Sequence, residues 1–101
     1  MLQTVKDQPG HEIYLTDKRW NHICEEHLEM RGYESHVLET IRRGRRFQDS
    51  VRPDVLLYYR DIEDLSAGNS TVVAVVRFGF SPGGAENNFV VTAYQIFRHG
   101  R

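Results

Sequence analysis

The stretch Thr71-Val72-Val73-Ala74-Val75-Val76-Arg77-Phe78-Gly79-Phe80 decides the fold, because it is almost continuously apolar. A short run of this kind that is rich in β-branched residues is typical of a central strand of a sheet. It is far too short to cross a bilayer as a helix, which needs about 20 apolar residues. We therefore expect a sheet built around this strand, and no membrane as a partner.

Turn-forming residues divide the rest of the second half into further strands. We expect a weak strand at 46–50, a stronger one after Pro53 at 54–60, and a last one at 88–98. A polar loop at 61–69 and a Pro-Gly-Gly hairpin loop at 81–88 separate them. Residues 11–15 are also compatible with a short edge strand.

Two amphipathic helices precede these strands. Thr16 stands where an N-cap is expected, and apolar residues then recur at three- and four-residue steps from about residue 17 to residue 30. A second helix is expected over 33–43, ending at Gly44. The order predicts an α+β fold in which two N-terminal helices pack on a four-stranded antiparallel sheet. Residues 1–12 would form an arm before a single domain at 13–101.

Size and composition limit the function. A chain of 101 residues has room for one packed core, so the function must fit on one small surface. The only cysteine, Cys24, cannot form an internal disulfide, and no N-terminal stretch of the given sequence combines basic residues, an apolar run and a cleavage site. We therefore expect a cytoplasmic protein.

Charge is segregated along the chain, although its net value is only −1. Residues 1–41 hold four basic and eight acidic side chains, a net charge of −4, whereas residues 42–60 hold six arginines against two aspartates, a net charge of +4. Arg42 and Arg43 have a structural explanation at the negative end of a helix dipole. Arg45 and Arg46 are candidates for binding phosphate or carboxylate groups, or are simply solvated.

His22 and His27 invite an interpretation as acid and base or as metal ligands. Residues five apart lie about 140° from each other around a helix, so these two side chains do not share a face. Helical zinc sites of the His-Glu-x-x-His or His-x-x-Glu-His type need a different spacing. We therefore predict no metal site and no cofactor. We expect His27 to point toward the sheet, and His22 to lie at the flank of the site or on the surface beside it.

Alternation along the last strands places polar residues in pairs. Tyr58 and Arg60 would emerge on one face of their strand, and Thr92 and Tyr94 on one face of theirs. The core would then be lined by the alternate positions, which are Val55, Leu57, Tyr59, Phe89, Val91, Ala93 and Phe97. High β propensity explains the tyrosines and the threonine singly, but less easily an arginine on the same face.

These side chains suit metal-free cleavage of RNA. A base activates the 2′-OH, an acid protonates the leaving 5′-oxygen, and a cation stabilises the charged phosphorane. Arg60, together with Arg77, would be the cation, a histidine and Tyr94 would transfer protons, and Thr92 would hold a phosphate oxygen. Tyr58 would contact the substrate.

The pattern resembles a known superfamily. Its elements are Trp20-x-His22-Ile23-x-x-x-His27-x-Glu29, Thr40-Ile41, Leu57-Tyr58-Tyr59-Arg60, Val73-Ala74-Val75-Val76 and Phe89-Val90-Val91-Thr92-Ala93-Tyr94. Together they resemble the small phage and bacterial proteins of the barnase, EndoU, colicin and RelE superfamily, over residues 13–97.

The resemblance implies a metal-independent ribonuclease or toxin-like activity, with RNA as substrate and an inhibitor or antitoxin protein as partner. It implies site residues at His22, His27, Arg60, Thr92 and Tyr94. Leu28 stands where relatives often have proline, which leaves the first helix free to continue. Two alternatives stay open: a non-catalytic module that binds RNA or protein through the basic turn, and a degenerate member with neither activity.

Overall fold

The computed structural model describes residues 2–63, 65 and 68–98 of the chain. Strands and helices follow one another in the order β1 (Leu2–Lys6), β2 (Glu12–Thr16), α1 (Asp17–Glu26), the 3-10 turn η1 (Leu28–Met30), α2 (Glu34–Arg43), β3 (Arg45–Gln48), β4 (Val55–Asp61), β5 (Thr71–Arg77) and β6 (Asn88–Ile96). The apolar run that begins at Thr71 is an inner strand, as predicted.

The sheet has six strands in the order β1-β2-β6-β5-β4-β3. All neighbours are antiparallel except β2 and β6, which pair in parallel at Ile13 with Asn88 and Tyr14 with Phe89. The prediction of a four-stranded antiparallel sheet was therefore wrong. Residues 2–6 form β1 and pair with β2, and this hairpin docks on β6. Only Val5 of β1 is buried, so the segment carries no apolar period that reveals a strand.

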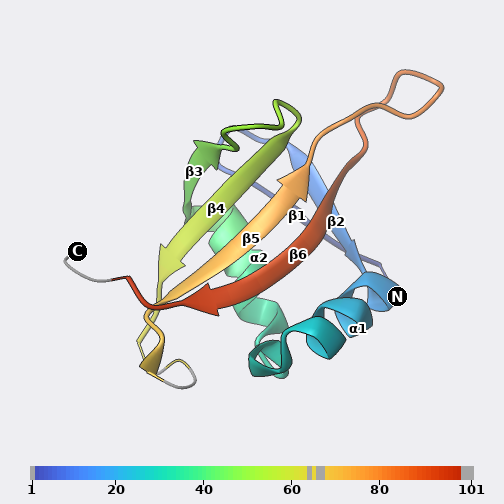
Figure 1. Ribbon diagram of the computed structural model, residues 1–101. Helices are drawn as coiled ribbons and strands as arrows, with labels where there is room; N and C mark the ends of the chain where they lie inside the picture. Colours follow the sequence, from blue (N-terminus) through green and yellow to red (C-terminus); the bar gives the residue numbers. More distant parts are fainter. Residues whose placement is uncertain (1, 64, 66–67, 99–101) are drawn as a thin grey trace.

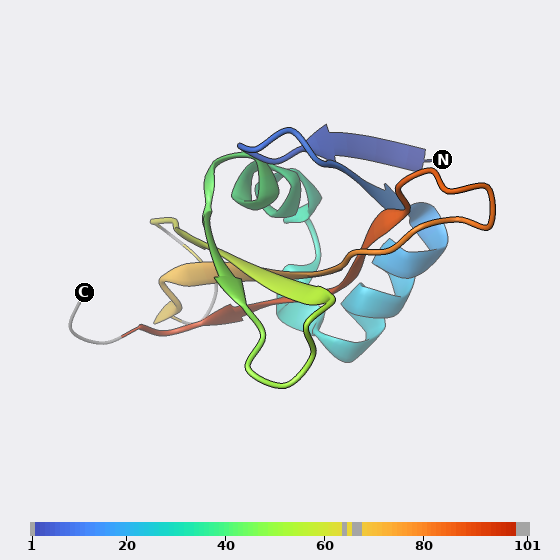
Figure 2. The same ribbon diagram turned by 90° about the horizontal axis from the view of Figure 1, so that it is seen from above.

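The sheet curves around α2, which lies between β1 and the strands β4 and β5 (Figures 1 and 2). A buried contact closes the curve on the far side of this helix. The Tyr58 hydroxyl of β4 donates a 2.7 Å hydrogen bond to the carboxylate of Asp7, which follows β1. The segment after the edge strand β1 is thereby joined to β4, the strand next to the opposite edge.

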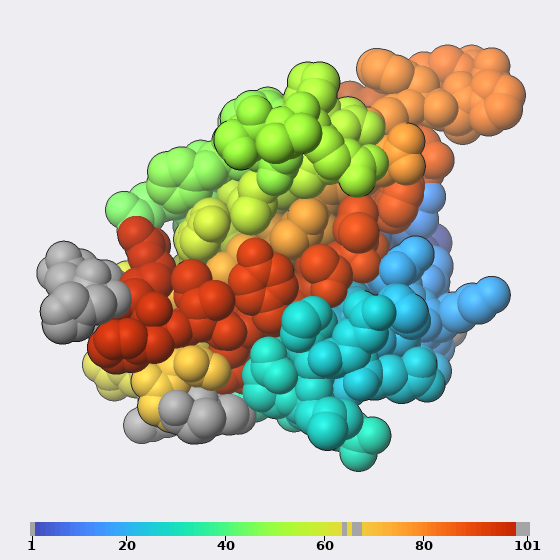
Figure 3. Space-filling view, in the orientation of Figure 1, coloured from blue at the N-terminus to red at the C-terminus, as the bar shows by residue number. Residues whose placement is uncertain are grey.

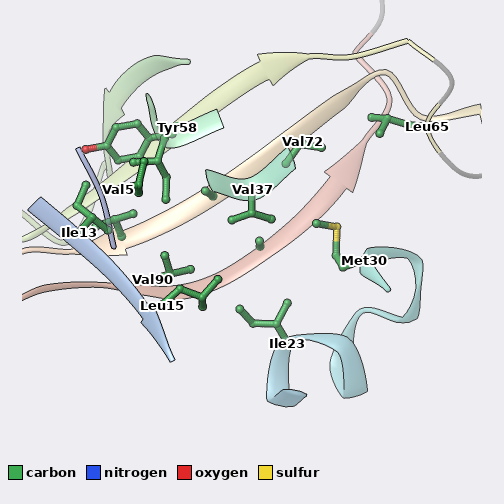
Figure 4. Packing of buried hydrophobic residues seen from close by; sticks show 14 residues of the cluster. Val5, Ile13, Leu15, Ile23, Met30, Val37, Tyr58, Leu65, Val72 and Val90 are labelled. Atoms are coloured by element: carbon green, nitrogen blue, oxygen red, sulfur yellow. The ribbon is translucent and has the colours of Figure 1, made fainter. Parts of the chain in front are cut away.

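The hydrophobic core fills the concave side of this sheet (Figure 4). Ile23 of α1, Met30 of η1 and Val37 of α2 are fully buried there. They meet inward-facing residues of the sheet, among them Ile13, Leu15, Tyr58, Val72, Ala74, Val76, Val90 and Ala93.

The first helix is shorter than predicted, because it ends at Glu26 rather than near Met30. Its N-terminus is capped as expected, with the Thr16 hydroxyl accepting a hydrogen bond from the amide of Arg19. At the other end His27 leaves the helical conformation, with φ −129° and ψ 83°. The chain bends there and continues as η1, which brings Met30 into the core.

Helix α1 and η1 cover an edge that the strands leave open. Because β2 pairs with β6 at only two positions, most of that side of β6 has no strand partner among the residues that the structure describes. Arg19 donates to the carbonyl of Val91 at 3.4 Å, and the Gln95 amide donates to the carbonyl of Glu29 at 2.9 Å. The Arg19 side chain of α1 also reaches the convex side of the sheet, where it lines a groove with Val75 and Val91. Within the described residues, no helix is long and apolar enough to span a membrane.

A candidate functional site on the open face of the sheet

The convex side of strands β3 to β6, which we call the open face, carries no helix across its middle (Figure 3). Strand register defines its residues. Tyr59, Val73 and Tyr94 form one row across β4, β5 and β6, and Leu57, Val75 and Thr92 form the next. Val73 is fully buried although it lies outside the main core, which shows that its neighbours on this face cover it.

The predicted orientation of β4 was wrong. Tyr58, expected on the exposed side, is fully buried in the core, whereas Leu57 and Tyr59 are partly exposed on the open face. All of these residues are large and form strands well, so alternation cannot reveal which set faces the helices.

The orientation of Thr92 and Tyr94 agrees with the prediction, and a β-bulge explains why the rest of β6 does not. Val76 pairs with Val90 and Val75 with Thr92, so Val91 is an extra residue. The bulge lets Val90 and Ala93, three apart, both face the core. Strict alternation cannot anticipate this shift.

His27 and Tyr94 meet at the margin of the open face. Their ring centroids lie 5.7 Å apart with a tilt of 39°. The Nδ1 atom of His27 lies 3.8 Å from a carboxylate oxygen of Glu29, and the side chain keeps 33% of its exposure. One nitrogen of the imidazole therefore faces a carboxylate, which leaves the other for a ligand.

Tyr94 and Thr92 add two hydroxyl groups to the same face of β6, and the ring of Tyr94 is the part that contacts His27. Burial raises the pKa of the Tyr94 phenol above its usual value, and the nearby Tyr59 and Asp49 raise it further. Tyr94 therefore keeps its proton at neutral pH. The hydroxyl oxygen of Thr92 is buried and has no hydrogen-bond partner among the described residues. A buried hydroxyl without a partner is uncommon and is a candidate contact for a ligand.

His22 is not part of this group. It lies on the outer side of α1, where its Nε2 is 3.4 Å from a carboxylate oxygen of Glu26 and half of its side chain is exposed. It lines a shallow pocket with Thr16, Lys18 and Arg19. The two histidines are thus separated, as their spacing predicts.

One end of the open face is a groove with an apolar floor and a basic rim, which we call the β5–β6 groove. It is lined by Arg19, Arg52, Arg77 and Asp49 around Val55, Val75, Phe89 and Val91. Arg77 donates to Asp54 at 3.1 Å, so part of its charge is neutralised. Val75 and Val91 adjoin Thr92, which connects the groove to the central hydroxyl groups.

The other end is a basic hollow at the ends of β4 and β6, which we call the arginine recess. Its side chains include Arg43, Arg45, Arg60 and Arg98, with Tyr59 and Asp61 between them. Arg60 pairs with Val72, a core-facing residue, so it leaves β4 on the concave side and opens into the recess at the sheet's end. Register thus separates Arg60 from the row of Tyr59 and Tyr94.

Tyr58 and Arg46 belong to a different cluster, on the concave side of the sheet. Both approach the carboxylate of Asp7, Tyr58 at 2.7 Å and Arg46 at 3.7 Å. The Asp7 side chain is fully buried and also accepts hydrogen bonds from the backbone amides of Gly10 and His11. Neither Tyr58 nor Arg46 lines the open face, the groove or the recess.

Sequence reasoning missed three residues of the open face: Arg19, Tyr59 and Arg98. Tyr59 is among the residues that alternation predicts for the core. The guanidinium carbon of Arg98 lies 5.5 Å from the centre of the Tyr59 ring. No local signal marks Arg98, because its contact with Tyr59 depends on the pairing of three strands.

Over the described ranges, no three histidine, cysteine, aspartate or glutamate side chains gather as a candidate metal-binding group. Comparison with protein-family models, curated proteins and solved structures found no match for this chain.

Proposed function

We propose that this chain is a metal-independent ribonuclease that cleaves RNA by attack of the 2′-OH, with its site on the open face. One observation carries the proposal: the imidazole of His27 packs on the ring of Tyr94, and Thr92, whose hydroxyl has no partner among the described residues, lies two residues before Tyr94 on β6. A proton acceptor, a proton donor and a hydroxyl that can hold a phosphate oxygen are thereby within reach of one phosphodiester.

The roles follow from the chemistry of each group. His27 takes the proton of the 2′-OH, and the 2′-oxygen attacks phosphorus to form a 2′,3′-cyclic phosphate. The bond from phosphorus to the 5′-oxygen breaks, and Tyr94 donates its proton to that oxygen. The raised pKa keeps the Tyr94 phenol protonated at neutral pH, which is the form that a proton donor must have.

The cation in this proposal differs from the one expected from sequence. Arg19 and Arg77 line the β5–β6 groove next to Thr92, whereas Arg60 opens into the arginine recess. We therefore assign stabilisation of the phosphorane charge to Arg19, with Arg77 adding positive potential to the groove. The resemblance to the barnase, EndoU, colicin and RelE superfamily supports the reaction class. An inhibitor or antitoxin protein that covers the open face is part of the same proposal.

Cleavage of labelled RNA in EDTA tests the proposal. We expect wild-type protein to cut, His27→Ala and Tyr94→Phe to lose about 10²- to 10⁴-fold in rate, and His22→Ala to lose little. His22→Ala is a matched control, because it removes an imidazole from the same helix. Equal cleavage by wild type and His27→Ala would indicate a contaminating nuclease and contradict the proposal.

A second candidate is a non-catalytic RNA-binding module on the same surface. Its support is the arrangement of aromatic rings between two groups of arginines, which is typical of platforms for single-stranded nucleic acid. Salt-dependent RNA binding that His27→Ala leaves unchanged, without cleavage, would favour it over the ribonuclease. Binding that does not respond to salt would count against both.

A further inference from the structure

The arginine recess is too rich in charge to be explained by the fold alone. Four arginines enter it from four segments: Arg43 from the end of α2, Arg45 from β3, Arg60 from β4, and Arg98 after β6. Arg43 has a partner outside the recess, since its Nε lies 2.9 Å from a carboxylate oxygen of Glu39. Counting Glu39 and the lining Asp61 against the four arginines leaves a net charge of +2.

Arg98 gives the clearest indication that the recess can bind an anion. Its guanidinium lies over the Tyr59 ring, 5.5 Å from the ring centre. Its Nη1 atom is buried and has no hydrogen-bond partner among the residues that the structure describes. A buried, charged donor without an acceptor is costly, and an anion in the recess would satisfy it.

The chemistry of the recess favours phosphate. Guanidinium groups present planar pairs of donors that match phosphate oxygens. The recess has a volume of about 490 Å³, which gives such a group room to enter. Tyr59 provides an aromatic face at the same place, against which a ribose or base can pack.

The recess lies beside the proposed catalytic groups. Tyr59 lines the recess and shares a row with Val73 and Tyr94, two strands away. With strands about 4.8 Å apart, that separation is about 10 Å. A phosphate in the recess is therefore too far away to be the one cleaved at His27 and Tyr94, but near enough to belong to the same RNA strand.

We infer that the arginine recess binds a second phosphate of the RNA substrate, on one side of the cleaved bond, and so holds the strand in register. This inference rests on the proposed ribonuclease function for the identity of its ligand. The recess would contribute to binding and positioning, while His27, Tyr94 and Thr92 act on the neighbouring phosphodiester.

Neutral phosphates test the inference without any need for cleavage. A short 2′-deoxy oligonucleotide, which lacks the attacking hydroxyl, is prepared with each phosphate replaced in turn by an uncharged methylphosphonate. Binding of each is measured to wild type, Arg98→Gln, Arg45→Gln and Arg42→Gln. Arg42 is the matched control, because it pairs with Glu39 beside Arg43 but does not line the recess.

We expect one position at which neutralisation weakens binding to wild type and to Arg42→Gln by about tenfold. The same replacement should change binding to Arg98→Gln and Arg45→Gln by less than about twofold, since their recess no longer holds that phosphate. Arg45 is exposed, so Arg45→Gln keeps the test valid even if Arg98→Gln does not fold. A loss of the same size in all four proteins would overturn the inference.

Two further outcomes separate this inference from neighbouring ideas. The first outcome is that the effect of the neutralised phosphate depends on Arg98 and Arg45, but the matching RNA is not cleaved. This would support the phosphate site and contradict the ribonuclease proposal. The second outcome concerns competition by a polyglutamate peptide and by inorganic phosphate. If the peptide displaces the oligonucleotide from wild type no less effectively than phosphate does, and Arg98→Gln reduces both effects equally, the recess binds an acidic protein and the inference is overturned.

Discussion

The imidazole of His27 packs against the phenol ring of Tyr94, at a centroid distance of 5.7 Å, although 66 residues lie between them in the chain. The contact depends on the end of α1 at Glu26, which turns His27 out of the regular helix. It also depends on the short parallel pairing of β2 with β6, which leaves room for α1 beside β6. The proposed proton acceptor and donor thus come from the two halves of the fold.

Tyr94 as the acid predicts a dependence on the leaving group. A 5′-ribose oxygen needs a proton as it departs, whereas a nitrophenolate does not. We expect Tyr94→Phe to lose at least about 10²-fold with RNA but only a few-fold with a nucleoside 3′-(nitrophenyl phosphate). His27→Ala should lose similar factors with both substrates. Rates measured on the two substrates decide this, and equal losses for Tyr94→Phe would remove the acid role.

Arg45 and Arg46, neighbours in sequence, should behave differently. Arg45 lines the recess, so Arg45→Gln should weaken RNA binding and lower the slope of log K against log salt by about 0.7 to 1. Arg46 lies by the buried Asp7 on the other side of the sheet, so Arg46→Gln should affect stability more than this slope. Titrations at several salt concentrations measure both. A lower slope for Arg46→Gln alone would contradict the assignment of faces.

The hydrogen bond from Tyr58 to Asp7 should stabilise the curved sheet. Tyr58→Phe leaves a buried carboxylate with one fewer donor, and we expect the free energy of unfolding to fall by about 1–3 kcal/mol. Tyr59→Phe, the matched control on the open face, should change it by much less. Urea unfolding of both variants provides the comparison. Near-equal losses would mean that the link between β1 and β4 contributes little.

The same hydrogen bond predicts a pH dependence of stability. Burial and the Asp7 carboxylate raise the pKa of Tyr58 in the folded protein. The protonated Tyr58 therefore contributes to the free energy of unfolding, and this contribution is fully present below the pKa of about 10 that tyrosine has in the unfolded chain. It is lost as pH rises above that value, by up to about 1.4 kcal/mol per pH unit. Because the pKa of Tyr94 is also raised, the comparison uses Tyr94→Phe against the double variant Tyr58→Phe/Tyr94→Phe. If the free energy of unfolding falls with pH at the same rate in both variants above about pH 10, this prediction is wrong.

Gly44 is required for packing rather than for an unusual backbone angle. A Cβ at this position would lie 2.3 Å from the carbonyl oxygen of Thr40 and 2.7 Å from that of Tyr59. We expect Gly44→Ala to cost at least about 1–3 kcal/mol, because backbone atoms must move. Gly83→Ala, with nothing within 4 Å, is the control and should be nearly neutral. Thermal unfolding of the two variants measures this difference. Equal melting temperatures would mean that α2 and β4 can move apart at this position with little loss of stability.

How far the sequence predicts this protein depends on the element. Thr71 to Arg77 was recognised as an inner strand because its apolar residues are continuous, and α2 because its stripe and Gly44 are clear. The strand β1 was missed because only Val5 of its five residues is buried. Pairing with β2 through backbone hydrogen bonds, rather than burial of side chains, holds it in the sheet.

The sequence by itself was sufficient to predict that His22 and His27 lie apart, that Thr16 caps the first helix, and that Thr92 and Tyr94 share one face of their strand. Each of these depends on helix or strand periodicity within a few residues. Only the tertiary structure decided that Tyr58 is buried while Tyr59 is partly exposed, that Arg60 and Arg98 share a recess, and that His27 meets Tyr94. Those relationships are set by strand order, by the bulge at Val91 and by the curvature of the sheet around α2, which join residues that no short stretch of sequence contains.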